Sequence, residues 1–140
     1  MAVMRVITFA LGCLLTVGCL GEASATPDEL RRYEFIADVK VNPETPVAGR
    51  MVNLNVELVS HSSELVVVDV VLRAVRTDGT QLHEQIWRDV TFHPEEVWNL
   101  TQGFISRNDE KGAFTVVVET REAGTNKVVW FGGGPSLTFR

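Results

Sequence analysis

Histidines and serines are the first residues to consider as candidates for catalysis or metal binding in this sequence. The three histidines, His61, His83 and His93, do not stand at a metal-site spacing from one another or from a cysteine. Ser62 and Ser63 follow His61, but adjacency in sequence does not make a nucleophile–base pair, and no oxyanion-forming glycine turn follows them. We therefore expect a protein that is not an enzyme, with no catalytic residue, no resident metal and no cofactor.

Two acidic segments and one glycine run also lack the patterns of known ion sites. His93–Glu96 and Asn108–Glu110 have no spaced ligands with a closing Glu, as a calcium loop would have. Gly132–Gly134 has no Lys-Ser or Lys-Thr ending and no helix after it, so it is not a phosphate loop. We expect solvated loops at the first two places and a bulge or bend at the third.

Three tryptophans could bind sugar rings by stacking. Trp87, Trp98 and Trp130 would do so only if at least two of them shared one exposed surface. Otherwise they are core residues, as large aromatic side chains usually are in a β-sandwich. Trp130 is the best candidate for carbohydrate binding, because it precedes the glycine run.

Alternating apolar and polar residues predict the elements that must position these side chains. Met51–Ser60 alternates cleanly, and Leu65–Arg76 carries an unbroken apolar row on one side, which are strand signals. Seven strands at intervals of about ten residues, with no helical period, predict an all-β fold: a single seven-stranded antiparallel sandwich over residues 33–140. The other strands are expected at Tyr33–Val41, Gln81–Val90, Val97–Ser106, Ala113–Glu122 and, in two halves, Lys127–Phe131 and Leu137–Phe139.

Asp78-Gly79 predicts a hairpin between the third and fourth strands. A two-residue loop places Trp87 against Val70 in the core, and alternates charged with apolar pairs on the outward face. A three-residue loop would shift the register by one and set Glu84 against the core residue Leu72, which buries an unpaired charge. We favour the first register, whose outward pairs are Asp69–Arg88, Val71–Ile86, Arg73–Glu84 and Val75–Leu82.

The N-terminal segment predicts export. Val6–Val17 is an apolar run too short to span a bilayer, and Ala23-Ser24-Ala25 fits a signal-peptidase cleavage site. We predict a signal peptide at 1–25 and a linker at 26–32. An alternative stays open, since Thr16–Cys19 is similar to a lipobox with Thr16 where Leu is usual, and Cys19 would then be lipidated.

Charge and cysteine content restrict the partners. The net charge is −5 and there is no basic run, which argues against binding to nucleic acid or to an anionic membrane. Both cysteines, Cys13 and Cys19, lie in the predicted leader, so the exported domain depends on its apolar core rather than on a disulfide. The expected location is periplasmic or extracellular, or alternatively a membrane surface reached only through a lipid anchor at Cys19.

Several turn and strand segments together resemble a known type of domain. Val41–Gly49, the turn Asp78–Thr80 and the segment Gly112–Val116 are similar to segments of the Ig-like and fibronectin-III-like modules of bacterial secreted proteins. Such modules accompany extracellular glycoside hydrolases or occur as adhesion-related repeats. The resemblance implies an Ig-like β-sandwich with a binding or structural role. This sequence departs from the pattern of such modules at Phe114, where they often carry a tyrosine.

The outward face of the central hairpin predicts a contact with another protein. Its apolar centre would consist of Val71, Val75, Leu82 and Ile86, with Arg73 and Glu84 among the charged residues that frame it. In Ig-like folds the sheet with the third strand commonly meets partners. We therefore predict a protein–protein interaction module of the cell envelope that binds a protein partner or a second copy. A loop or the N-terminal segment covering this face is one alternative, and a carbohydrate-binding or glycoside-hydrolase accessory module is the other.

Overall fold

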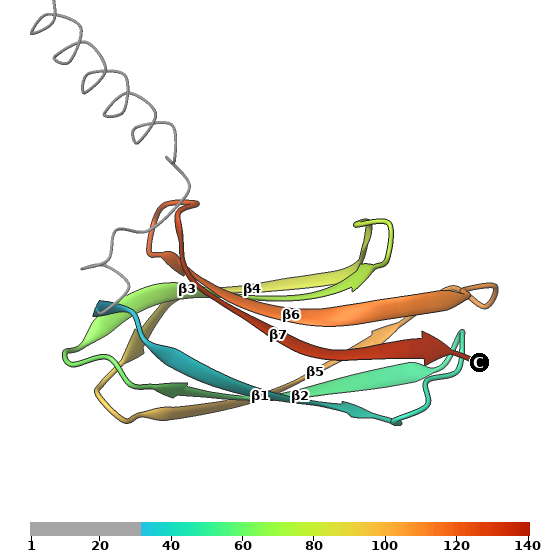
Figure 1. Cartoon of the computed structure of the whole chain (residues 1–140), viewed down its shortest axis with the longest axis horizontal. Helices are drawn as coiled ribbons and strands as arrows, with labels where there is room; N and C mark the ends of the chain where they lie inside the picture. Colours follow the sequence, from blue (N-terminus) through green and yellow to red (C-terminus); the bar gives the residue numbers. More distant parts are fainter. Residues whose placement is uncertain (1–31) are drawn as a thin grey trace, which may run out of the picture.

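The computed structural model describes residues 32–140. The predicted signal peptide, most of the linker and the lipidation candidate Cys19 lie outside the described residues. Seven strands follow one another along the chain (Figure 1). They are β1 (Phe35–Asn42), β2 (Met51–Ser60), β3 (Val66–Arg76), β4 (Gln81–Phe92), β5 (Val97–Ile105), β6 (Gly112–Glu122) and β7 (Val128–Phe139).

The strands form two antiparallel sheets that pack face to face (Figure 1). One sheet has the order β1-β2-β5 and the other has the order β4-β3-β6-β7. In the immunoglobulin constant-type sandwich the fourth strand belongs to the sheet of the first two. Here β4 instead pairs with β3, so the predicted all-β sandwich is confirmed with three and four strands in its sheets.

The core lies between the sheets and comes from the alternation seen in the sequence. On β2, Val52, Leu54, Val56 and Leu58 are buried while the residues between them face outward. Such a period of two is what a strand with one covered face produces. Edge-to-face or tilted aromatic pairs continue this core at both ends: Phe35–Phe92, Phe104–Phe114 and Phe114–Phe139.

The β3–β4 hairpin follows the favoured register only in its middle. Val70 faces Trp87 and Arg73 faces Glu84, as predicted. The loop, however, is a three-residue loop, since the Arg76 N–H donates to the Thr80 carbonyl (2.8 Å) and Gly79 takes a left-handed φ of 88°. A bulge between the loop and Ala74 then restores the predicted register.

This bulge corrects the prediction for Leu82. Val75 faces Gln81 rather than Leu82, and the Leu82 side chain packs against the core. A second bulge places Arg88 and Asp89 together opposite Asp69, with Asp89 at a φ of 53°. Asp69 nevertheless forms the predicted ion pair with Arg88, whose Nη1 lies 3.1 Å from Asp69 Oδ2.

β7 is one continuous strand and not two halves, which corrects the sequence prediction. The register with β6 shifts opposite Val116, so the glycine run forms the predicted bulge without ending the strand. At Gly134 the two sheets come close together. A Cβ there would lie 3.1 Å from the Val39 Cβ of β1 and 3.1 Å from the Val116 carbonyl oxygen.

Candidate functional site

The outer face of the four-stranded sheet is concave. In Figure 1 the turn between β3 and β4 and the turn between β6 and β7 both rise away from the sandwich, at opposite ends of this face. Local twist from the bulges in both hairpins accounts for such bending. The face that was predicted to meet a partner is therefore a shallow trough.

The residues predicted as the apolar centre of a contact do not all lie in this trough. Val75 and Ile86 are half-buried on the outer face. Val71 also belongs to the outer face, but it is fully buried between Ile86 and Glu119 of the neighbouring strands. Leu82 points to the core, as described above. The bulge beside the turn is the reason, because one extra residue on β4 turns Leu82 to the other face.

A buried carboxylate with two arginines covers the middle of the trough. Glu119 is 4% exposed, and its Oε2 accepts from Arg73 Nη2 at 3.0 Å while its Oε1 accepts from Arg121 Nε at 2.9 Å. Arg73 faces Glu84 across the ladder, as predicted, but its guanidinium contacts Glu119 of β6 instead. The Arg73 Nε is buried without a hydrogen-bond partner. This ion-pair cluster of Arg73, Glu119 and Arg121 ties β3 to β6.

Beside the cluster the trough deepens into a hollow of about 630 Å³. Val75, Ala113, Thr115 and Val117 line it, together with the side chain of Phe131, which is 59% exposed. Gly133 faces Val117 in the ladder, and no heavy atom lies within 4 Å of where its Cβ would be. Because Val117 lines the hollow, a side chain at position 133 would lie beside it in open space on the outer face.

The hollow ends at a clamp between two loops. Arg76 donates from Nε and Nη2 to the two carboxylate oxygens of Glu110, at 2.8 and 2.9 Å. This bidentate hydrogen bonding lowers the pKa of Glu110 and raises that of Arg76. Within the turn, hydrogen bonds from Thr80 to the Asp78 carboxylate lower the pKa of Asp78. The hairpin tip is thus fastened to the β5–β6 loop.

All three tryptophans are half-buried and pack against the core. Trp87 lies at the edge strand β4 and meets Trp98 of β5 edge-to-face, with ring centroids 5.4 Å apart. The Trp130 ring packs at a tilt against the Phe35 ring, with 5.9 Å between the ring centroids, and it occupies the space beside Gly132. The placement of Trp87 against the core is as predicted, and sugar binding at Trp130 stays a prediction.

The histidines are spread over the molecule. His83 stacks on Phe104 with ring centroids 5.4 Å apart, and its partial burial lowers its pKa. His61 pairs with Glu95 at 3.0 Å. Among residues 32–140 no three His, Cys, Asp or Glu side chains come together in a group that would hold a metal ion. Within the same residues, no helix has the length and hydropathy needed to cross a membrane.

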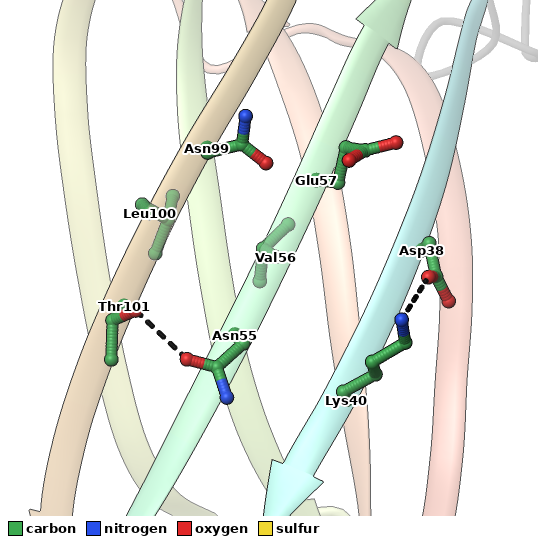
Figure 2. Close-up of a pocket in the computed structure, with 8 residues that line it drawn as sticks. All are labelled: Asp38, Lys40, Asn55, Val56, Glu57, Asn99, Leu100 and Thr101. Atoms are coloured by element: carbon green, nitrogen blue, oxygen red, sulfur yellow. Dashed lines mark hydrogen bonds and ion pairs between the residues drawn. The ribbon is translucent and has the colours of Figure 1, made fainter.

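The outer face of the three-stranded sheet carries a second, smaller recess of about 300 Å³ (Figure 2). Whereas the lining of the hollow mixes apolar with polar and charged side chains, polar side chains from all three strands surround this recess. They are Asp38 and Lys40 of β1, Asn55 and Glu57 of β2, and Asn99 and Thr101 of β5.

Sequence reasoning missed Phe131, Glu119 and Arg121. Phe131 was expected only as the end of a half-strand, and nothing in the run Val128–Phe131 says which of four apolar residues faces outward. The bulge at Val129 decides this. The alternation of Val118 and Glu119 did mark Glu119 as outward, but it gave no sign that two arginines would bury it.

Several solved structures resemble this chain in fold. No protein-family model matches it, and no curated protein does. The CARDB domain of the PF1109 protein of Pyrococcus furiosus, solved in complex with di-metal ions, superposes with a TM-score of 0.50 at 16% identity, over 76% of this chain and 84% of that one. A β-glucuronidase of glycoside hydrolase family 2 gives a TM-score of 0.55 at 17% identity, over 74% of this chain.

A cycloisomaltooligosaccharide glucanotransferase of Paenibacillus sp. gives a TM-score of 0.55 at 15% identity, over 76% of this chain. The match spans only 11% of the β-glucuronidase and 14% of the glucanotransferase. At these identities the likeness concerns the fold alone. The described chain is a β-sandwich domain similar in fold to a CARDB domain and to domains of larger glycosidases, which is consistent with an Ig-like module.

Proposed function

We propose that this protein is a non-catalytic recognition module of the cell envelope, which binds a protein partner or a second copy through the trough of the four-stranded sheet. The observation that carries the proposal is the hollow with Phe131 at its side. A depression with apolar side chains such as Val75 and Val117 beside a largely exposed aromatic ring is uncommon on a surface that meets only water.

The composition of the hollow supports a protein as the ligand. Aromatic residues and arginine are the types enriched at protein interfaces, and Phe131, Arg73 and Arg76 line this one. The two arginines are held by Glu119 and Glu110, so they are ordered before any partner arrives. Less side-chain freedom is then lost on binding, which favours affinity. The location at the envelope rests on the predicted signal peptide.

A matched pair of positions tests the proposal. Phe131 and Ile105 are 59% and 61% exposed and lie on the outer faces of opposite sheets. A photo-crosslinking amino acid at position 131 should trap a specific protein or a second copy in intact cells, while the same group at 105 should not. Phe131→Glu should abolish the contact and Ile105→Glu should keep it, with both variants as stable as the wild type.

Light scattering of the purified protein separates the two partners, because only self-association changes the mass of the protein alone. Equal crosslinking at positions 131 and 105, or none at 131 in a monomeric protein, would contradict the proposal. A specific contact should also bury about 1,000 Å² or more in total. Ile86→Lys, near the middle of the same trough, should weaken the contact as Phe131→Glu does.

A further inference from the structure

The recess on the three-stranded sheet is built from two complete rows of polar side chains. The strand register places Asp38, Glu57 and Asn99 side by side, because Asp38 faces Glu57 on β1 and β2, and Glu57 faces Asn99 on β5. The next outward row consists of Lys40, Asn55 and Thr101. Figure 2 shows these six side chains around the recess.

Much of the hydrogen-bonding capacity of these rows is unused within the protein. Thr101 Oγ1 donates to Asn55 Oδ1 at 2.8 Å, and Lys40 Nζ lies 3.4 Å from Asp38 Oδ2 (Figure 2). Within the described chain, Glu57 and Asn99 make no side-chain hydrogen bond or ion pair. Glu57 also faces Asp38 directly, and like charges at opposite positions of a ladder destabilise a sheet. Donors and acceptors are therefore both available to a ligand.

The mixture of charges selects the class of ligand. An anion would be repelled by Asp38 and Glu57. A metal ion would be repelled by the ammonium of Lys40, which lies 3.4 Å from the Asp38 carboxylate. No metal-binding group of three side chains occurs among residues 32–140. A neutral molecule with many hydroxyl groups suits this recess best, because each hydroxyl both donates and accepts.

An apolar strip borders the polar rows on one side. Ile36, Val59 and Val97 form the next outward row, about 7 Å along the strands from Asp38, Glu57 and Asn99. Ile36 is 58% exposed and Val97 is 49% exposed. A pyranose ring has hydroxyls at its edge and C–H groups on its faces, so it needs polar groups next to apolar ones.

We propose that the recess binds a neutral saccharide. The carboxylates of Asp38 and Glu57 accept hydrogen bonds from sugar hydroxyls, while the Asn55 amide and the Lys40 ammonium donate to them. Ile36 and Val97 contact the C–H face of an adjoining ring. This site lies on the opposite sheet from the proposed protein contact and does not involve Trp130, so it stands or falls independently of both.

Nuclear magnetic resonance titration of the ¹⁵N-labelled protein tests the site. The probes are cellohexaose, xylohexaose, mannohexaose and chitohexaose. At least one of them should give saturable shifts at the amides of residues 36–40, 55–59 and 97–101. Glu57→Ala should weaken that binding by about tenfold or more, since it removes a charged acceptor.

Two further variants make the result specific. Glu57→Gln keeps an acceptor oxygen and loses the charge, so it should weaken saccharide binding less than Glu57→Ala does. Thr115→Val, on the outer face of the other sheet, should leave the affinity unchanged. The proposal is overturned if no probe gives saturable shifts at the recess, if the shifts centre on Trp130, or if Glu57→Ala binds as tightly as the wild type.

Discussion

The two outer faces of this sandwich hold their charges in opposite ways. On the four-stranded sheet the carboxylate of Glu119 is buried between Arg73 and Arg121. On the three-stranded sheet Glu57 is exposed and has no ion-pair partner among the described residues, although it faces Asp38. The same alternation of apolar and polar residues predicts both faces as outward. Alternation alone therefore does not distinguish a face with buried ion pairs from one whose charges are exposed to solvent.

The difference follows from the width of the sheets and the length of the side chains. β3 and β6 are inner strands of a four-stranded sheet, so their outward side chains have neighbours on both sides. Long arginine stems from both strands can then cover Val71 and shield Glu119 from water. In the three-stranded sheet only β2 is an inner strand. Its outward residues Asn53, Asn55 and Glu57 include no long side chain such as arginine that could shield a neighbour from water.

The largest expected effect comes from removing the buried carboxylate. Glu119→Ala leaves Arg73 and Arg121 without their partner, and it should lower the free energy of unfolding by about 2–4 kcal/mol. The arginine side chains are 25% and 19% exposed and can turn to water, which keeps the loss below that of a fully enclosed pair. Urea denaturation measures the change.

Glu57→Ala is the matched control on the other face. It should change the free energy of unfolding by no more than about 0.5 kcal/mol, as for most surface substitutions. It relieves the repulsion from Asp38, so a slight gain in stability is in keeping with the comparison. Equal losses for the two variants would mean that the two faces do not differ in the way described.

Two neighbouring glycines give the next largest contrast. Gly134→Val pushes a side chain against Val39 and the Val116 carbonyl, and should cost about 1–3 kcal/mol by overpacking. Gly133→Val places its side chain in open space beside Val117 and should cost about 0.5 kcal/mol or less. Thermal unfolding distinguishes the two. Gly133→Val should nevertheless weaken capture of a partner, since the new side chain lies beside Val117 at the hollow. Normal capture by this variant would mean that the contact lies on another part of the surface.

The strands themselves could be predicted from the sequence because their signal is local. Met51–Ser60 matches β2 at both ends, and the middle of the β3–β4 register follows from pairing charges with charges. The glycine run did indicate the bulge in β7, but the two bulges of the β3–β4 hairpin could not be predicted, since each depends on one residue fitting or failing to fit a partner strand. The bulge before Leu82 therefore reversed the orientation of one predicted contact residue.

The candidate site depended on pairings between distant strands and was correspondingly harder to predict. Arg73 was matched with Glu84 because they share a hairpin, but its guanidinium reaches Glu119, which is 46 residues away. Glu84 faces Arg73 directly, whereas Glu119 faces Val71 and is a diagonal neighbour of Arg73, so pairing by register alone selects the wrong carboxylate. Phe131 was missed for the same reason, because the bulge at Val129 decides which side of β7 it occupies.

Acid should loosen the clamp at the end of the trough, which is the bidentate pair of Arg76 and Glu110. Glu110 has a lowered pKa through its hydrogen bonds with Arg76, so the clamp contributes stability above the ordinary carboxyl pKa. That contribution is lost as the pH falls through the lowered pKa of Glu110. Glu110→Gln should remove this part of the acid dependence in urea midpoints measured at a series of pH values. An unchanged pH profile in the variant would show that the clamp contributes nothing to stability.

The smallest expected effect concerns the contact between the two sheets at the edge formed by β4 and β5. His83 of β4 stacks on Phe104 of β5, and partial burial lowers its pKa below the usual value of 6.5. The unfolded chain therefore binds a proton at a pH where the folded chain does not, and stability falls as the pH drops from 6.5 through the lowered pKa. His83→Phe keeps the stacking and removes both the proton site and the unpartnered, buried Nε2. It should raise stability slightly at pH 7 and flatten the profile below 6.5, as measured by thermal unfolding at closely spaced pH values. A variant that keeps the wild-type slope would place the acid sensitivity elsewhere, and one that is less stable at every pH would mean that the imidazole makes a contact which phenylalanine cannot replace.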